Sequence, residues 1–121
     1  MATNRFRNNI FIILLFTVTQ ISYSGIKSPT VNEYIRDDTG VYDSYICGLQ
    51  SGLEWASEHY YRRQGMEIYC KPGNIELPIT ELRKIINKTI NSKPGFFKEY
   101  ENEHLIGLAL RNGLIRKFPC Q

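Results

Sequence analysis

The chain of 121 residues has few of the residues that catalytic and metal sites usually require. It contains two histidines and three cysteines, and their spacing matches no zinc motif. It has no glycine-rich phosphate loop, and no serine lies in a nucleophile elbow. Its longest largely apolar run, 10–18, is shorter than the roughly 20 residues that a membrane-spanning helix needs. We therefore expect a protein that is not an enzyme, holds no metal and needs no cofactor.

The first 24 residues have the layout of a secretory signal peptide. Two arginines precede the apolar run 10–18, and Ser22 and Ser24 place small residues at the −3 and −1 positions of a cleavage site. We predict cleavage after Ser24, export to the periplasm and a single mature domain over 25–121, with no stable membrane insertion. The alternative is that the same run is a buried helix or an uncleaved anchor.

The charge of the chain gives no sign of a nucleic-acid partner. Cleavage removes two arginines from a chain whose formal net charge is +3, so the mature domain is close to neutral. Nucleic-acid-binding proteins present a clustered basic face. The pair Arg62-Arg63 is better explained as a solvated helix end, and we expect no nucleic acid to bind.

Apolar residues of the mature domain repeat at helical spacing, and strand signals are scarce. Thr30 and Glu33 form a capping box, which predicts a short helix from Val31 to about Asp38. Longer periodic stretches predict three further helices, over about 41–61, over 78–91, and from between 96 and 100 to about 116. We predict an all-α fold, a small bundle of three main helices plus a short N-terminal helix.

The predicted second helix has an unusual composition. Its apolar stripe is expected at Tyr42, Ile46, Leu49, Leu53, Ala56 and Tyr60. Gly48 and Gly52 flank this stripe, and each glycine costs a helix about 1 kcal/mol relative to alanine. We therefore expect another backbone to approach them closely. Trp55 points away from the stripe, so it lies either on a partner-binding surface or under the short helix or the following loop.

The three cysteines cannot all pair within one chain. In an up-down-up bundle the start of the third helix lies near the end of the last, which places Cys70 close to Cys120. We predict a disulfide between these two residues, with Cys47 left as a free thiol. His59 is about 18 Å from Cys47 along the same helix, too far for a catalytic pair. A secreted enzyme that uses Cys47 with His104 remains a distant alternative.

The loop over 62–77 is the predicted partner-binding surface. It is long and partly aromatic, and we expect Tyr60, Tyr61, Arg63 and Tyr69 to contact a partner. A disulfide within the loop would reduce the entropy that is lost on docking. The alternative is that these residues only cap one end of the bundle.

Three motifs occur in order along the mature chain. They are Tyr45-Ile46-Cys47-Gly48 followed by Gly52-Leu53-Glu54-Trp55-Ala56, then Ile68-Tyr69-Cys70-Lys71-Pro72, and finally Phe118-Pro119-Cys120. Together they resemble the Y-I-x-G…G-x-x-W-A, C-x-P and F-P-C elements of the Rap/Tai type of immunity proteins of bacterial type VI secretion. The resemblance covers roughly 30–120, nearly the whole mature chain.

The resemblance implies a small helical immunity protein of the periplasm. Such a protein binds a secreted effector, typically a peptidoglycan amidase, and neutralises it by stoichiometric inhibition. The paired cysteines of the family correspond to Cys70 and Cys120. A periplasmic structural or acid-stress protein without an effector is the second hypothesis, and a homodimer is left open.

Overall fold

The computed structural model describes residues 28–121, which form five helices and no strands. The helices are α1 (Val31–Arg36), α2 (Asp43–Gln64), α3 (Ile79–Ser92), α4 (Pro94–Glu99) and α5 (Ile106–Lys117). The prediction of a small all-α bundle is confirmed. The predicted signal peptide and its cleavage after Ser24 lie outside the described residues. None of the helices described is both long and apolar enough to span a bilayer.

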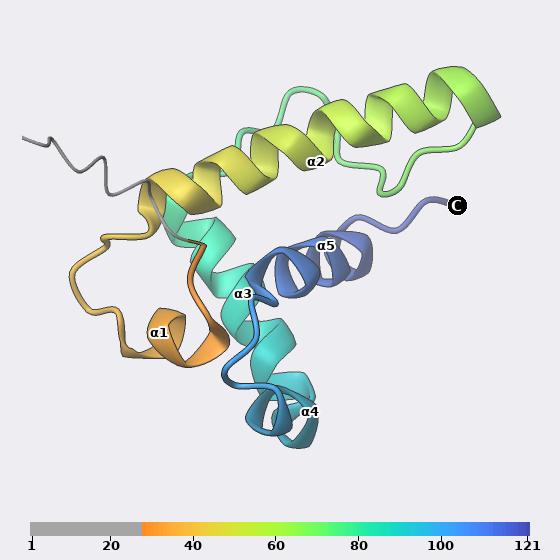
Figure 1. Cartoon of the computed structure of the whole chain (residues 1–121). Helices are drawn as coiled ribbons and strands as arrows, with labels where there is room; N and C mark the ends of the chain where they lie inside the picture. Colours follow the sequence, from red (N-terminus) through yellow and green to blue (C-terminus); the bar gives the residue numbers. More distant parts are fainter. Residues whose placement is uncertain (1–27) are drawn as a thin grey trace, which may run out of the picture.

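The longest helix, α2, extends beyond the rest of the bundle (Figure 1). Its N-terminal half lies over α3 and α5, which make the most extensive helix–helix contact in the described chain. Its C-terminal half has no helix beneath it, and the connection to α3 and the C-terminal segment run beside it instead. The short helices α1 and α4 lie toward the other end of the bundle.

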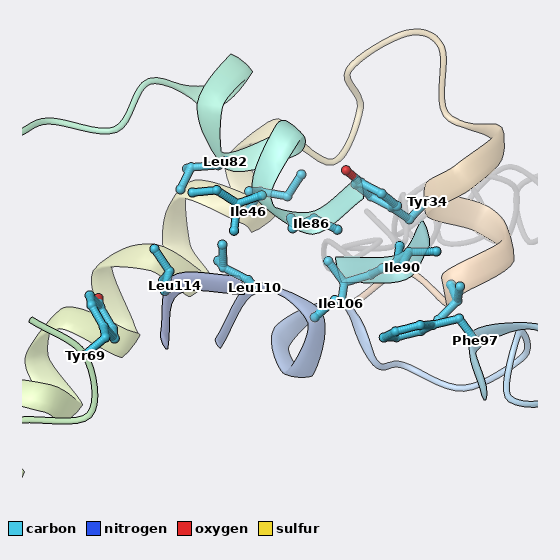
Figure 2. Packing of buried hydrophobic residues seen from close by; sticks show 13 residues of the cluster. Tyr34, Ile46, Tyr69, Leu82, Ile86, Ile90, Phe97, Ile106, Leu110 and Leu114 are labelled. Atoms are coloured by element: carbon cyan, nitrogen blue, oxygen red, sulfur yellow. The ribbon is translucent and has the colours of Figure 1, made fainter. Parts of the chain in front are cut away.

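The core is built mainly from α3 and α5 (Figure 2). On α3 the apolar residues recur at helical spacing, as predicted, and Leu82, Ile85, Ile86 and Ile90 are buried. Residues Ile106, Ala109, Leu110 and Leu114 of α5 pack against them. Phe97 of α4 and Val31 and Tyr34 of α1 close the end of this core.

Helices α3 and α5 approach each other closely at Gly113 of α5. A Cβ atom at this position would lie 2.7 Å from Thr89 Oγ1 and 3.0 Å from the Ile85 carbonyl oxygen, and would overlap Ile85 Cγ2. These separations are shorter than van der Waals contact, so only glycine lets α5 lie this close to α3.

The start of α1 confirms the predicted capping box. Thr30 Oγ1 accepts a hydrogen bond from the Glu33 amide at 3.1 Å, and the Glu33 carboxylate accepts one from the Thr30 amide at 2.8 Å. The helix ends at Arg36, two residues earlier than predicted. Asp37 follows it, and its Oδ1 accepts hydrogen bonds from Thr39 N at 3.0 Å and Gly40 N at 3.1 Å.

Asp37 also joins α1 to α3. Arg83 Nη2 donates to Asp37 Oδ2 at 2.9 Å, and Arg83 Nε donates to Asp43 Oδ1 at 2.8 Å. The guanidinium carbon lies 5.4 Å from the centre of the Tyr34 ring. Burial by itself raises the pKa of Asp37, but the hydrogen bonds from Arg83 and Thr39 outweigh it and hold that pKa well below its usual range.

The prediction of one last helix that begins between 96 and 100 is wrong. The chain forms α4 first, and α5 begins only at Ile106. Between them, the carbonyls of Glu101 and Glu103 accept hydrogen bonds from Asn32 N at 2.9 Å and Val31 N at 3.0 Å. The first amide groups of α1 need acceptors, and these carbonyls supply them because they are not used within a helix.

The predicted stripe of α2 is correct only in its N-terminal half. Ile46 is buried and Leu49 and Leu53 pack against the core, whereas Ala56 and Tyr60 are exposed. The stripe fails there because α3 and α5 do not reach beneath the end of α2 (Figure 1). The connecting loop covers Ser57 instead, whose Oγ accepts a hydrogen bond from Ile68 N at 3.0 Å.

The prediction of a close backbone approach at Gly48 and Gly52 is also wrong. Both residues are exposed, and within residues 28–121 no atom beyond the adjacent backbone of α2 lies within 4 Å of a Cβ built at either position. The described chain therefore does not require glycine at these two positions for packing.

The predicted disulfide is confirmed. Cys70 and Cys120 are bonded, with their Cα atoms 5.0 Å apart, and Cys70 N donates to the Phe118 carbonyl at 2.8 Å. Cys47 is free, as predicted, and it is exposed on α2. The disulfide thus joins the α2–α3 connection to the C-terminal end of the chain.

Candidate protein-binding surface

The structure places three of the four predicted partner-binding residues on the outside. Tyr60, Tyr61 and Arg63 lie in the last turns of α2, and the Tyr61 side chain is 55% exposed. Tyr69, in contrast, is only 4% exposed. The expectation that its ring contacts a partner is therefore wrong, because the ring packs into the core near Leu114 (Figure 2).

Tyr69 is buried because the chain around it is fixed on both sides. On one side Ile68 N is bonded to Ser57 of α2, and on the other Cys70 is joined to Cys120. No described group lies within hydrogen-bonding distance of the Tyr69 hydroxyl. Burial, with a smaller contribution from Glu54, raises the pKa of Tyr69 to about 12.

A small hollow of about 130 Å³ separates the end of α2 from this loop. Its lining residues are Glu54, Ser57, Glu58, Tyr61, Glu67, Tyr69 and Lys71. Lys71 Nζ pairs with Glu54 at 3.1 Å, and Glu58 pairs along the helix with Arg62. With three carboxylates and one lysine, the lining itself carries net negative charge.

Trp55 is a further exposed aromatic residue of α2, on a different side of the helix from Tyr60 and Tyr61, which follow it by five and six residues. Its side chain is 70% exposed, so it lies at the surface and not beneath the short helix or the loop. It follows Gly48 by seven residues and Gly52 by three, a spacing that places all three on one side of a helix. The two glycines border a shallow, mainly apolar hollow of about 480 Å³, which Tyr45, Leu49 and Leu53 also line.

This part of α2 combines features of a protein-binding site. Trp and Tyr are enriched at the energetic centres of interfaces. Here Tyr61 lines the small hollow at the end of α2, and Trp55 lies one turn after Gly52, which borders the apolar hollow. Met66, at the turn after α2, adds a further 58% exposed apolar side chain. We call Trp55, Tyr60, Tyr61, Arg63 and Met66 the α2 surface.

The alternative of a cysteine–histidine pair finds no support among the described contacts. His104 Nδ1 lies 3.4 Å from Ser28 Oγ, and no described hydrogen bond joins the ring to Cys47. One group of metal-type donors comes together in the described residues, Glu67 with Cys70 and Cys120. Both of these sulfurs belong to the disulfide, so they do not offer thiolates to a metal.

Comparisons of this chain with protein-family models, curated proteins and solved structures give no match. The resemblance to the Rap/Tai type therefore rests on the three sequence motifs. The structure shows where their residues lie. Cys70 and Cys120 hold the fold together, whereas Gly48, Gly52 and Trp55 lie at the surface of α2.

Proposed function

We propose that the mature domain is a periplasmic immunity protein of the Rap/Tai type. It binds a secreted type VI effector, a peptidoglycan amidase, and neutralises it by occupying a surface that the effector needs for activity. The observation that carries this proposal is the exposed aromatic α2 surface on a disulfide-stapled scaffold.

The shape of α2 supports this proposal. The C-terminal half of α2 extends beyond α3 and α5, so a partner could enclose it from more than one side (Figure 1). Partners commonly bind such a helix in a groove, where a few large side chains serve as anchors. Trp55 and Tyr61 are the anchors expected here, because each still exposes more than half of its surface in the free protein.

The rigidity of the loop supports the proposal as well. The disulfide and the Ile68–Ser57 hydrogen bond fix the loop against α2 before any partner binds. Little conformational entropy is then lost on docking, which favours tight stoichiometric binding. Inhibition of this kind requires no catalytic group in the inhibitor.

The test uses the mature chain, 25–121, with its disulfide intact, and the candidate effector encoded in the neighbouring reading frame. Calorimetric titration measures the affinity, and release of peptide from peptidoglycan measures the amidase activity. We expect a one-to-one complex without amidase activity. Failure to bind, together with failure to protect cells that express the effector, would refute the immunity function and leave the structural or stress-protein hypothesis.

Alanine variants test the α2 surface within that complex. Trp55→Ala or Tyr61→Ala is expected to weaken binding by about 30-fold, the effect of losing one interface anchor, and Arg63→Ala by less. Tyr100→Ala is the matched control, because this tyrosine is 41% exposed but follows α4 at the other end of the bundle. An equal loss of affinity in the control, or wild-type affinity in the α2 variants, would exclude the α2 surface as the binding site.

A further inference from the structure

A groove between α3 and α5 forms a second surface, separate from the α2 surface. Its volume is about 340 Å³. Lys84 and Lys88 of α3 and Arg116 and Lys117 of α5 line it, with Glu81 as the single acidic residue. The two pairs of cations are far apart in the sequence and meet only because α3 and α5 pack together.

The cations of this groove are only partly neutralised. Glu81 pairs with Lys84 at 2.9 Å and with Lys117 at 3.3 Å, and hydrogen bonds from these two lysines lower the pKa of Glu81. Within residues 28–121, no carboxylate oxygen lies within 4.0 Å of the side-chain nitrogens of Lys88 or Arg116. Arg116 Nη1 reaches only Ser92 Oγ, at 3.3 Å. The rim therefore carries a local excess of positive charge in a nearly neutral domain.

The floor of the groove is largely apolar. It is formed where Gly113 packs directly against Ile85 and Thr89, and Ile85 supplies its apolar side chain. The Thr89 hydroxyl is buried and donates to the Ile85 carbonyl at 3.0 Å, so it is already satisfied. Cationic side chains thus surround a floor that offers apolar contact.

We propose that this groove binds an acidic polypeptide segment that carries an apolar side chain. Carboxylates of the segment pair with Lys88 and Arg116 at the rim, and the apolar side chain packs on Ile85 and Gly113. This assignment rests on the groove alone and does not depend on the proposed immunity function.

Two other anionic ligands fit the groove less well. A free phosphate is usually held by backbone N–H groups at a helix start or in a nest. Ile85, Thr89 and Gly113 lie within α3 and α5, where the backbone N–H groups donate the hydrogen bonds of the helices. Double-stranded DNA needs a row of phosphate contacts along an extended basic face, whereas this groove gathers four cations around one depression.

The test is an NMR titration of isotope-labelled mature chain, 25–121, which contains every described helix. The probe is an acetylated octapeptide of six glutamates and two leucines, and the matched peptide carries glutamine in place of glutamate. We expect the glutamate peptide to move the amide signals of Lys88, Thr89 and Gly113. These signal changes should become smaller as the salt concentration is raised, since salt screens exposed charge pairs.

Charge-reversal variants locate the binding. The double variant Lys88→Glu with Arg116→Glu is expected to weaken binding of the glutamate peptide by about tenfold or more. Arg36→Glu with Lys98→Glu is the control, because it makes the same change in net charge at exposed positions that do not line the groove. The control should bind within about twofold of wild type.

Several outcomes would overturn the proposal. They are equal binding of the glutamine peptide, equal weakening in the two double variants, and signal changes confined to residues outside the groove. If inorganic phosphate or duplex DNA moved the same signals at a lower concentration than the peptide, that ligand and not an acidic peptide would be the one assigned to the groove. Because this assay contains no effector, its failure leaves the proposed immunity function untouched.

Discussion

Among the helical glycines, Gly113 should be one that this fold cannot replace, whereas Gly48 and Gly52 should be replaceable with a gain in stability. All three lie inside helices, so alanine gains about 1 kcal/mol of helix propensity at each position. The difference lies in the space around them. A Cβ at Gly113 meets the Ile85 backbone at 3.0 Å, whereas a Cβ at Gly48 or Gly52 meets no atom of another described segment within 4 Å.

These distances determine how much each substitution should change the free energy of unfolding. Overpacking a core costs about 1–3 kcal/mol, and contact with backbone atoms that cannot rotate away points to the upper end. After the gain in propensity, Gly113→Ala should lower the free energy of unfolding by about 2 kcal/mol. Gly48→Ala and Gly52→Ala should each raise it by about 0.5–1 kcal/mol. For a domain of this size, these changes correspond to a fall of about 8–16 °C in the thermal midpoint for Gly113→Ala and a rise of a few degrees for the other two variants.

The assay is urea unfolding of the mature chain under oxidising conditions, followed by far-ultraviolet circular dichroism. The slope of unfolding free energy against urea concentration should be the same in wild type and variants, so that differences in the urea midpoint report differences in stability. A Gly113→Ala variant as stable as wild type would refute the close packing of α3 and α5. A loss of stability in Gly48→Ala or Gly52→Ala would show that these glycines pack against something within the chain after all.

Three further predictions follow from the disulfide and from two titrating residues. Reduction of the Cys70–Cys120 disulfide, or its replacement by a pair of serines, should lower the free energy of unfolding by about 4 kcal/mol, the chain-entropy estimate for a separation of 50 residues, as measured by urea unfolding. Under native oxidising conditions, a thiol reagent should modify only Cys47. The folded pKa of Tyr69 is raised to about 12, so its contribution to stability should be complete below about pH 10 and be lost between about pH 10 and 12. Tyr69→Phe should abolish that loss, and it should not destabilise the protein at pH 7 because the Tyr69 hydroxyl has no described hydrogen-bond partner. Because the folded pKa of Asp37 is lowered, its contribution should be present above about pH 4 and be lost as the pH falls further, so Asp37→Asn should flatten the acid side of a stability–pH curve.

The features that sequence reasoning predicted correctly depend on local contacts or on simple topology. The capping box joins Thr30 and Glu33, three residues apart, and the buried face of α3 follows from the spacing of its isoleucines. The disulfide could be predicted because, in an antiparallel bundle, the segment before one helix lies close to the segment after the next.

The features that sequence reasoning missed depend on contacts between distant segments. The break between α4 and α5 stems from the hydrogen bonds that the Glu101 and Glu103 carbonyls accept from α1. Tyr69 resembled a surface aromatic because nothing in its neighbours shows that the disulfide holds the loop against the core. The basic groove was hidden because its cations divide between α3 and α5, and each helix alone shows no more than two adjacent basic residues.

The glycines of α2 connect the fold to the proposed function. Gly48 and Gly52 cost the helix stability, yet the described chain gains no packing from them. A gain outside the chain would account for this cost, because glycine keeps open the hollow beside Trp55. On this reasoning, the same Gly48→Ala and Gly52→Ala substitutions that stabilise the free protein should weaken its complex with the effector. If the variants were both more stable and equally tight in binding, the hollow would have no role in the complex, and the anchors Trp55 and Tyr61 would have to account for the affinity alone.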